Sequence, residues 1–237
     1  MTDFKKINNL TGWAVFLVSL ITYVLTVEET ASFWDCGEFI ACSVTLGVPH
    51  PPGTPLFLLL GNVFSNLPTF DDIGARVNLM SPIASAFSVM FLYQTIILFL
   101  KRFIDDNPEK QKLIEYCAII GALTFAVTDS HWFNAVESEV YALSTFFTSI
   151  VIWLALKWDE RPFNTNSIKY LILISYMMGL ATGIHILNLL AIPCIIFILF
   201  YNKKRSPSLN EIDYKILFKN ILYIAFLSFL VFAMIYQ

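Results

Sequence analysis

Two carboxylates and one histidine stand close together in the mostly apolar stretch 33–57. Asp35 and Glu38 are three residues apart, so a helix would place them on neighbouring faces. His50 follows in the sequence PHPPG, residues 49–53, whose prolines restrict the backbone of a short connection. A carboxylate among apolar side chains is a candidate general base, and a histidine could donate to an anionic oxygen. Solvated loop acids and a simple turn into the next helix are the alternative interpretations.

Glu139 and His185 are two further ionisable residues at the ends of apolar runs. Glu139 opens the run 139–156, where a negative charge suits a helix N-terminus, so capping and a role in a site have equal weight. His185 separates two apolar runs, and a lone histidine there is also expected as a hydrogen-bond donor between helices. Both residues belong to a site only if the fold brings them near Asp35.

The composition indicates whether water or lipid surrounds the helices that must position these residues. Of the 237 residues, 57% are hydrophobic and 14% are charged, and the mean hydropathy is +0.68. Soluble domains are only about 45–50% apolar. We therefore expect an all-α integral membrane protein. No basic patch with interleaved aromatic residues occurs, which argues against nucleic-acid binding.

Seven apolar runs are candidate transmembrane helices, because about 20 apolar residues are needed to cross a bilayer. We predict spans near 10–27, 77–100, 113–129, 139–156, 168–184, 186–201 and 216–236. The first run is followed by two glutamates and no small-residue cleavage site, so we interpret it as a retained helix and not a signal peptide. The segment 54–67 is too short to cross and is expected to be an interfacial or re-entrant helix. The prediction is one transmembrane domain, 1–237, with interfacial helices in an outer loop, 28–75.

The basic residues predict the orientation of these spans. With a cytoplasmic N-terminus and seven alternating spans, fourteen Lys and Arg residues lie inside and only Arg76 lies outside. Treating 54–67 as a further span would move the basic loops 101–112 and 203–205 outside, against the positive-inside rule. The same orientation places the three histidines, Asp35 and Glu38 on the outer face. We therefore expect the chemistry of the protein on the extracytoplasmic side.

Four motifs, WDCGEF, LGVPHPPGTPLF, ESEVYAL and GLATGIHILNLLAIP, occur in this order along the chain. With acidic residues after the first span, a Pro-Pro motif before an amphipathic helix and a basic residue opening the second span, the chain resembles polytopic glycosyltransferases of the GT-C fold. More closely, it resembles a bacterial membrane family related to the vertebrate protein O-mannosyltransferase of plexin-type receptor ectodomains. The resemblance covers about residues 30–200. Because family members are usually longer, we expect this chain to be the N-terminal part of a longer protein.

The resemblance implies transfer of a mannose-like hexose from a polyprenyl-phosphate donor to a hydroxyl acceptor on a protein or glycan. It implies a location in a bacterial inner membrane, with the N-terminus in the cytoplasm and the active site outside. Asp35 matches the catalytic carboxylate of the family and Glu38 matches its companion. We accordingly expect Asp35 to act as the general base, with Glu38 orienting Asp35 or the acceptor.

The departing phosphate of such a reaction needs cations or hydrogen-bond donors. Arg76 is the first candidate because it is the only outer Arg or Lys, and His50 and His185 are the next candidates. Glu139 and Tyr141 are candidates for binding hydroxyl groups of the sugar or the acceptor.

The sequence predicts no metal and no cofactor, since the lipid-linked sugar is a substrate. The four cysteines show no ligand spacing typical of a metal site. The expected partners are the lipid-linked donor, the acceptor and membrane lipids. A transporter or a flippase of lipid-linked sugars is the alternative function, because proline-broken helices with polar residues also suit transport.

Overall fold

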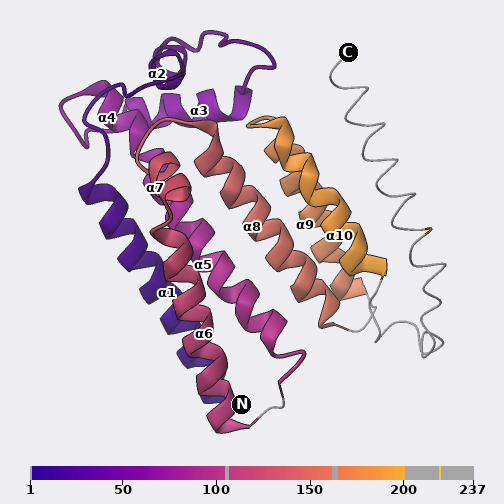
Figure 1. The fold of residues 1–237 in the computed structure, drawn as a ribbon. Coiled ribbons are helices and arrows are strands. Elements are labelled where there is room, and N and C mark those ends of the chain that lie inside the picture. The colour runs from indigo at the N-terminus through magenta and orange to yellow at the C-terminus, as the bar shows by residue number, and fades with distance from the viewer. Residues whose placement is uncertain (1, 105–106, 162–164, 201–218, 220–237) are drawn as a thin grey trace.

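The computed structural model describes residues 2–104, 107–161, 165–200 and 219, and within these ranges every regular element is a helix (Figure 1). Long apolar runs favour helices in a bilayer because the helix satisfies its own backbone hydrogen bonds. The elements are α1 (Thr2–Leu25), α2 (Cys36–Thr45), α3 (Pro55–Ser65), α4 (Ile73–Asn78), α5 (Met80–Leu100), α6 (Pro108–Ala126), α7 (Asp129–Ala135), α8 (Val140–Asp159), α9 (Thr165–Thr182), the 3₁₀ helix η1 (Ile186–Leu190) and α10 (Ala191–Phe200).

Three helical stretches are long and apolar enough to cross a membrane: Lys6–Leu25, Ile73–Leu100 and Val140–Asp159. A fourth span is formed if α6 and α7 are counted together, although the chain bends by 66° between them. These helices confirm that the chain is a membrane protein. They correspond to the predicted spans 10–27, 77–100, 139–156 and 113–129.

The predicted number of seven spans stays a prediction. Within the part of the chain that the structure describes, α9 and the η1–α10 pair are shorter apolar helices. The break predicted near residues 183–185 is confirmed, because α9 ends at Thr182 and η1 begins at Ile186. The last predicted span, 216–236, lies outside the described residues apart from residue 219.

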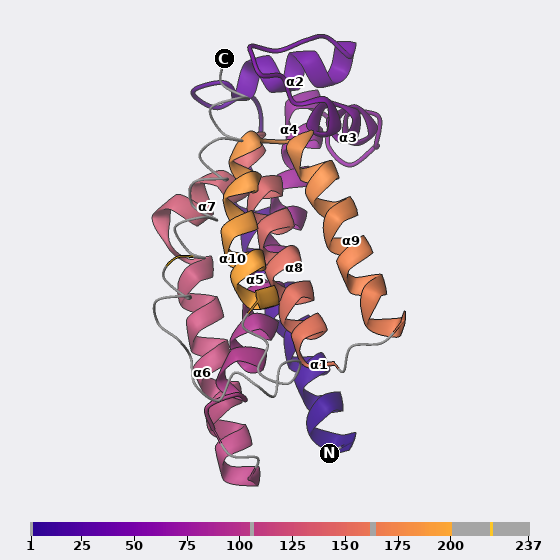
Figure 2. The ribbon, with the colours of Figure 1, turned by 90° about the vertical axis from the view of Figure 1, so that its right-hand side faces the viewer.

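Helices α2, α3 and α4 form a cap, residues 36–78, at one end of the bundle. Figures 1 and 2 show α2 and α3 lying across this end, roughly perpendicular to α5 and α8. Helix α3 has only 11 residues, about 16 Å of helix, so it is too short to cross a bilayer, as the sequence predicted for 54–67. We call this the cap end of the molecule.

Close packing joins the two helices of the cap. Gly61 in α3 faces Ser43 in α2, and a Cβ at position 61 would lie 2.9 Å from the Cβ of Ser43. The side-chain amide of Asn62 donates to the carbonyl oxygens of Ser43 and Val44 at 2.9 and 3.3 Å. Phe39 of α2 and Phe57 of α3 contact each other with tilted rings, 5.3 Å between centroids, and join the core of α5 and α8. The cap is therefore fixed to the bundle by buried aromatic side chains.

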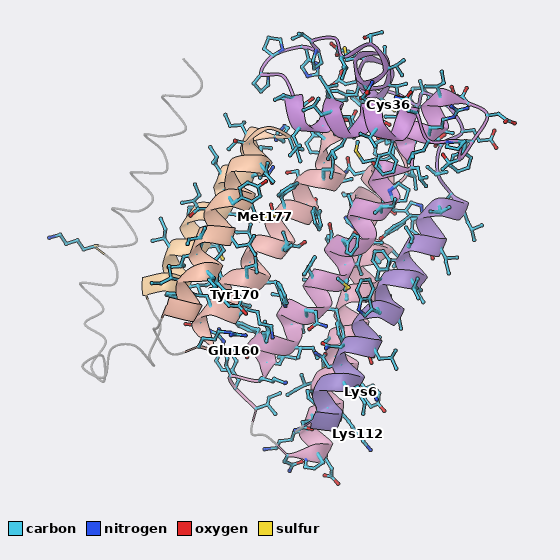
Figure 3. The ribbon with its side chains drawn as sticks, turned by 180° about the vertical axis from the view of Figure 1, so that it is seen from behind. Lys6, Cys36, Lys112, Glu160, Tyr170 and Met177 are labelled. Atoms are coloured by element: carbon cyan, nitrogen blue, oxygen red, sulfur yellow. The ribbon has the colours of Figure 1, made fainter. Side chains whose placement is uncertain are left out.

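The two ends of the bundle differ in charge. Figure 3 shows Cys36 at the cap end, and Lys6, Lys112 and Glu160 toward the opposite end. Helices α1, α6 and α9 begin at this opposite end, while α5 and α8 finish there (Figure 1). The basic residues that the structure describes in these helices and their connections therefore lie at this end, and we call it the basic end. Among the described residues, Arg76 of α4 is the exception at the cap end.

Candidate functional site

The loop that follows α1 is held against the bundle by one buried asparagine. Asn78, at the end of α4, is fully buried, and its side-chain amide donates to the carbonyl oxygens of Glu28 and Thr30 at 2.8 and 2.9 Å. The side-chain oxygen of Asn78 accepts from the hydroxyl of Ser138 at 2.6 Å. The backbone N–H of Glu28 donates to the carbonyl of Val136 at 2.9 Å. These bonds place the acidic stretch after α1 beside the α7–α8 corner.

Asp35, Glu38 and His50 meet at the start of α2. Asp35 occupies the N-cap position of α2 but makes no side-chain capping bond, so its carboxylate is not engaged by the helix. Glu38 accepts two hydrogen bonds from His50, one from Nδ1 at 2.7 Å and one from the backbone N–H at 2.8 Å. The Nε2 atom of His50 lies 4.0 Å from a carboxylate oxygen of Asp35. The predicted grouping of these three residues is therefore present in the structure.

Hydrogen bonding between Glu38 and His50 sets their charge states. The hydrogen bond from His50 is the main cause that lowers the pKa of Glu38. The hydrogen bond to Glu38 is the main cause that raises the pKa of His50, with a smaller electrostatic effect from Asp35 and Glu139. The ring of His50 rests on buried Phe39 at 5.6 Å between ring centroids. The raised pKa of His50 favours an imidazolium, whose Nε2 atom is the one near Asp35.

A cavity of about 350 Å³ opens beside Asp35, within the size range of ligand sites. It lies between the acidic loop and the α7–α8 corner, and its walls are Trp34, Asp35, Phe133, Asn134, Glu137, Glu139 and Tyr141. Glu139 is only 5% exposed. Burial, followed by the charges of Glu137 and Asp35, raises the pKa of Glu139 to about 7. Two of the predicted polar residues, Glu139 and Tyr141, thus share one cavity with Asp35.

Glu137 is a site residue that the sequence analysis did not select. It is 1% exposed, and one of its carboxylate oxygens accepts from the hydroxyl of Ser32. Its other oxygen, Oε1, has no hydrogen-bond partner among the described residues. Burial raises the pKa of Glu137, with a further contribution from Glu28. The available signal was its spacing of two residues from Glu139 in the motif ESEVYAL.

Asn78 and Trp34 were missed for different reasons. Asn78 appears in the sequence as one polar residue in an apolar helix, and only the fold reveals the loop that it holds. Trp34 is 85% exposed and has a φ of 60°, a left-handed conformation that is unusual for a bulky residue. It turns the chain immediately before Asp35 and forms a wall of the cavity. No pattern in the sequence indicates that conformation.

His185 contacts Tyr141, which lines the cavity beside Asp35. The two rings are 5.4 Å apart between centroids, and Nδ1 of His185 accepts from the backbone N–H of Leu187 at 3.2 Å. An accepting Nδ1 leaves the proton on Nε2. Burial lowers the pKa of His185, which favours the neutral ring. His185 can therefore donate a hydrogen bond from Nε2 but does not add a positive charge.

Arg76 is not among the residues that line the cavity. Its guanidinium group donates to the carbonyl oxygens of Phe70, Ser65 and Asp71 at 2.6, 3.4 and 3.3 Å. These bonds hold the loop between α3 and α4. The structure thus brings together Asp35, Glu38, His50, Glu139, Tyr141 and, at the edge, His185, but gives Arg76 contacts within the cap.

The carboxylates of Asp35 and Glu38 and the ring of His50 could also hold a metal ion. Their potential ligand atoms all lie within 4.8 Å of one another, and no other such group occurs among the residues that the structure describes. All three side chains are exposed. The hydrogen bond between Glu38 and His50 already accounts for their approach. The absence of a metal requirement stays a prediction.

Comparison with known proteins connects this site to a family. Residues 35–208 match the family model described as the protein O-mannosyl-transferase TMEM260 N-terminal domain. The chain is 26% identical over 199 residues to protein O-mannosyl-transferase tmem260 of Dictyostelium discoideum, covering 78% of this chain and 23% of that protein. It is 27% identical over 200 residues to protein O-mannosyl-transferase TMEM260 of Mus musculus, covering 83% of this chain and 27% of that protein.

The matches cover most of this chain but only a small part of each relative. The aligned part of the chain spans about a quarter of the length of these two relatives. No solved structure matches the chain. The family match begins at Asp35 and includes Glu38, His50, Glu139, Tyr141 and His185. Because it covers well over half of the sequence, the chain belongs to the family of the protein O-mannosyl-transferase TMEM260 N-terminal domain.

Proposed function

We propose that the chain is the membrane module of a glycosyltransferase that moves a mannose-like hexose from a polyprenyl-phosphate donor to a protein hydroxyl group. The observation that carries this proposal is the placement of Asp35 between His50, which is hydrogen-bonded to Glu38, and a cavity lined by further acids. The two relatives are named protein O-mannosyl-transferases, which supports the choice of sugar and acceptor. By the positive-inside rule, we propose that the cap end faces away from the cytoplasm.

The donor would approach the cap end with its lipid in the bilayer and its sugar in the cavity. The phosphate group would lie next to His50, whose pKa is raised by Glu38. A cation beside the leaving phosphate stabilises the charge that develops on it. His185 supplies a second, neutral donor near Tyr141. As a candidate for binding the phosphate, Arg76 ranks below these two residues, because its guanidinium group is already bonded to three backbone carbonyls.

The reaction would be a single displacement at the anomeric carbon. The acceptor oxygen forms a bond to this carbon while the bond from the carbon to the phosphate oxygen breaks. The polyprenyl phosphate leaves with the electron pair, and the proton of the acceptor hydroxyl passes to Asp35. Asp35 suits this role because its carboxylate lines the cavity and makes no bond to the helix it caps. Glu38 acts on His50, which it positions through two hydrogen bonds.

Glu139 is assigned to binding a hydroxyl group rather than to taking the proton. With a pKa of about 7, it is partly protonated near neutral pH and can donate or accept a hydrogen bond. Tyr141, 45% exposed at the same cavity, offers a phenol group for the same purpose. A transporter remains the alternative function, but the grouped acids lie at the cap end and not midway along the spans.

The test uses the full-length protein with a defined polyprenyl-phosphate mannose and an acceptor peptide. Asp35→Asn removes the base but keeps the size of the side chain, so transfer should fall by about 10²–10⁴-fold. Donor binding should persist, because the lost interaction acts mainly in the transition state. The assignment of Asp35 fails if the well-folded variant transfers at the wild-type rate.

The same assay distinguishes the candidates for the phosphate. His50→Ala should weaken donor binding more than Arg76→Ala does, because Nε2 of His50 lies 4.0 Å from the Asp35 carboxylate, whereas the guanidinium group of Arg76 is already bonded to three backbone carbonyls. Arg76→Lys serves as the matched control that keeps the charge. A larger binding defect in Arg76→Ala, with normal thermal stability, would make Arg76 the first candidate for the phosphate again, as predicted from the sequence.

A further inference from the structure

A second cavity, of about 640 Å³, lies at the basic end of the bundle, at the opposite end from the candidate site. Its walls come from α1, α5 and α8 and from the segments that begin α6 and follow α8. Helix α5 lies between the other two, since it packs against both α1 and α8. Figure 3 shows these three helices from behind and labels Glu160, one of the wall residues. Nothing in the proposed transfer reaction uses this cavity.

The wall residues change character along the helix axes. Toward the middle of the bundle the cavity is lined by Trp13, Met90, Phe91 and Trp153. From Met90 to Lys101 helix α5 rises by about 16 Å, and from Trp153 to Arg161 the chain covers about 12 Å if it stays helical. The cavity therefore has an aromatic inner part and a charged outer part.

The outer part carries an excess of positive charge. Among the wall residues that the structure describes, Lys101, Lys157 and Arg161 line it, with Glu160 as the one acid. The ammonium group of Lys157 lies 3.8 Å from a carboxylate oxygen of Glu160. The ammonium group of Lys101 lies 4.4 Å from the ring centroid of Phe4. Three cations against one carboxylate form a local field that attracts an anion.

Polar groups occupy the boundary between the two parts. The side-chain amide of Asn8 donates to the side-chain oxygen of Gln94 at 3.2 Å, and its oxygen accepts from Tyr93 at 2.8 Å. The indole nitrogen of Trp153 is buried and has no hydrogen-bond partner among the residues that the structure describes. A buried N–H without a partner costs free energy, so an acceptor entering the cavity would be favoured.

We propose that this cavity binds an anionic phospholipid, with the phosphate near Lys101 and Arg161 and the upper glycerol and acyl carbons beside Trp13 and Trp153. A lipid fits better than a soluble phosphate compound because the aromatic part continues the charged part toward the middle of the bilayer. An ester carbonyl of the lipid would accept from the indole N–H of Trp153. Basic pockets between transmembrane helices are known to hold anionic headgroups.

The test measures lipid binding to the purified full-length protein by native mass spectrometry in detergent. The probes are dioleoyl-phosphatidylglycerol, dioleoyl-phosphatidylcholine and glycerol 3-phosphate. Wild-type protein should retain the anionic lipid more strongly than the zwitterionic one, and glycerol 3-phosphate should not displace it at equal concentration. Equal retention of the two lipids overturns the proposal, and displacement by glycerol 3-phosphate shows that the site recognises a soluble anion instead.

Two pairs of substitutions separate the cavity from the general charge of the basic end. Lys101→Gln with Arg161→Gln should weaken binding of the anionic lipid by about 30-fold, from roughly one kcal/mol per cation removed. Lys6→Gln with Lys112→Gln makes the same change in charge at exposed positions outside the cavity and should change binding less than about twofold. Equal losses in both pairs would show a diffuse surface effect and overturn the site.

Trp153→Phe tests the inner part of the cavity. It keeps an aromatic ring but removes the unpartnered N–H, so binding of the anionic lipid should weaken about fivefold, the usual net worth of one hydrogen bond. Unchanged binding would show that the indole N–H of Trp153 does not contact the lipid and that the cations alone recognise it. Thermal melting without lipid shows whether each variant is folded. The comparison of the two lipids on wild-type protein does not depend on any variant.

Discussion

At the residue scale, the pair formed by Glu38 and His50 makes donor binding depend on pH. The pKa of His50 is raised mainly by its hydrogen bond to Glu38, so the imidazolium persists to a higher pH than in an isolated histidine. The phosphodiester of the donor stays ionised throughout this range. Donor binding should therefore be strong at low pH and should weaken as the pH rises through the pKa of His50.

The variant Glu38→Gln isolates this effect. It removes the main cause that raises the pKa of His50, so the loss of donor binding should occur at a lower pH than in the wild-type protein. Asp35 and Glu139 still face the ring and contribute a smaller shift in the original direction. Binding of a fluorescent donor measured from pH 5 to 8.5 provides the comparison. Identical pH profiles for the two proteins would exclude His50 as the phosphate partner.

Glu139 should make stability depend on pH in the opposite sense to an ordinary ion-paired acid. Its pKa is raised from 4.5 to about 7, so the folded protein keeps a proton that the unfolded chain has lost between these values. The free energy of unfolding should fall as the pH rises through this window, by up to about 3 kcal/mol. Glu139→Gln should flatten the dependence of melting temperature on pH, while the exposed control Glu29→Gln should not. The same slope in Glu139→Gln and wild type would refute this.

At the element scale, Asn78 of α4 connects the loop after α1 to the α7–α8 corner. Asn78→Ala removes the two bonds to the carbonyls of Glu28 and Thr30 and leaves these groups without that partner. We expect a loss of about 2–4 kcal/mol of stability, because buried polar groups that lose their partners are costly. Melting in detergent measures this loss.

A matched control for Asn78 is present in the cap. Asn62 also donates from its amide to two carbonyls, those of Ser43 and Val44, but it is only partly buried. Asn62→Ala should therefore cost less, because water can replace the lost bonds. If Asn62→Ala destabilises the protein as much as Asn78→Ala, then burial of Asn78 is not what fixes the acidic loop.

At the scale of the whole molecule, the separation of the cap end from the basic end predicts the orientation in the membrane. In a protein without its native cysteines, Asp72→Cys at the cap end should react with an impermeant maleimide added from outside. Glu109→Cys, at the start of α6 and the basic end, should react only after the membrane is opened. The reverse labelling pattern would place the candidate site in the cytoplasm and exclude an extracytoplasmic acceptor.

The sequence alone determined the class of the protein and selected Asp35, Glu38 and His50, which the structure brings together. Its apolar runs identified the helices that are long and apolar enough to cross a membrane, because a bilayer selects long apolar segments whatever their tertiary contacts. The short spacing from Asp35 to His50 was enough to bring these residues together, since α2 and one proline-rich loop connect them. Arg76 was selected by charge counting, a criterion that carries no information on which groups the side chain bonds.

Only the tertiary structure decided which distant residues complete the site. Glu137 and Glu139 lie about 100 positions from Asp35, and their approach depends on Asn78 and Ser138 joining three separate segments. The raised pKa of Glu139 follows from burial among these segments, which periodicity does not encode. The cavity at the basic end likewise exists because α1 and α8 each pack on α5. Spacing along one chain specifies a helix face, but a cavity between helices depends on how those faces meet.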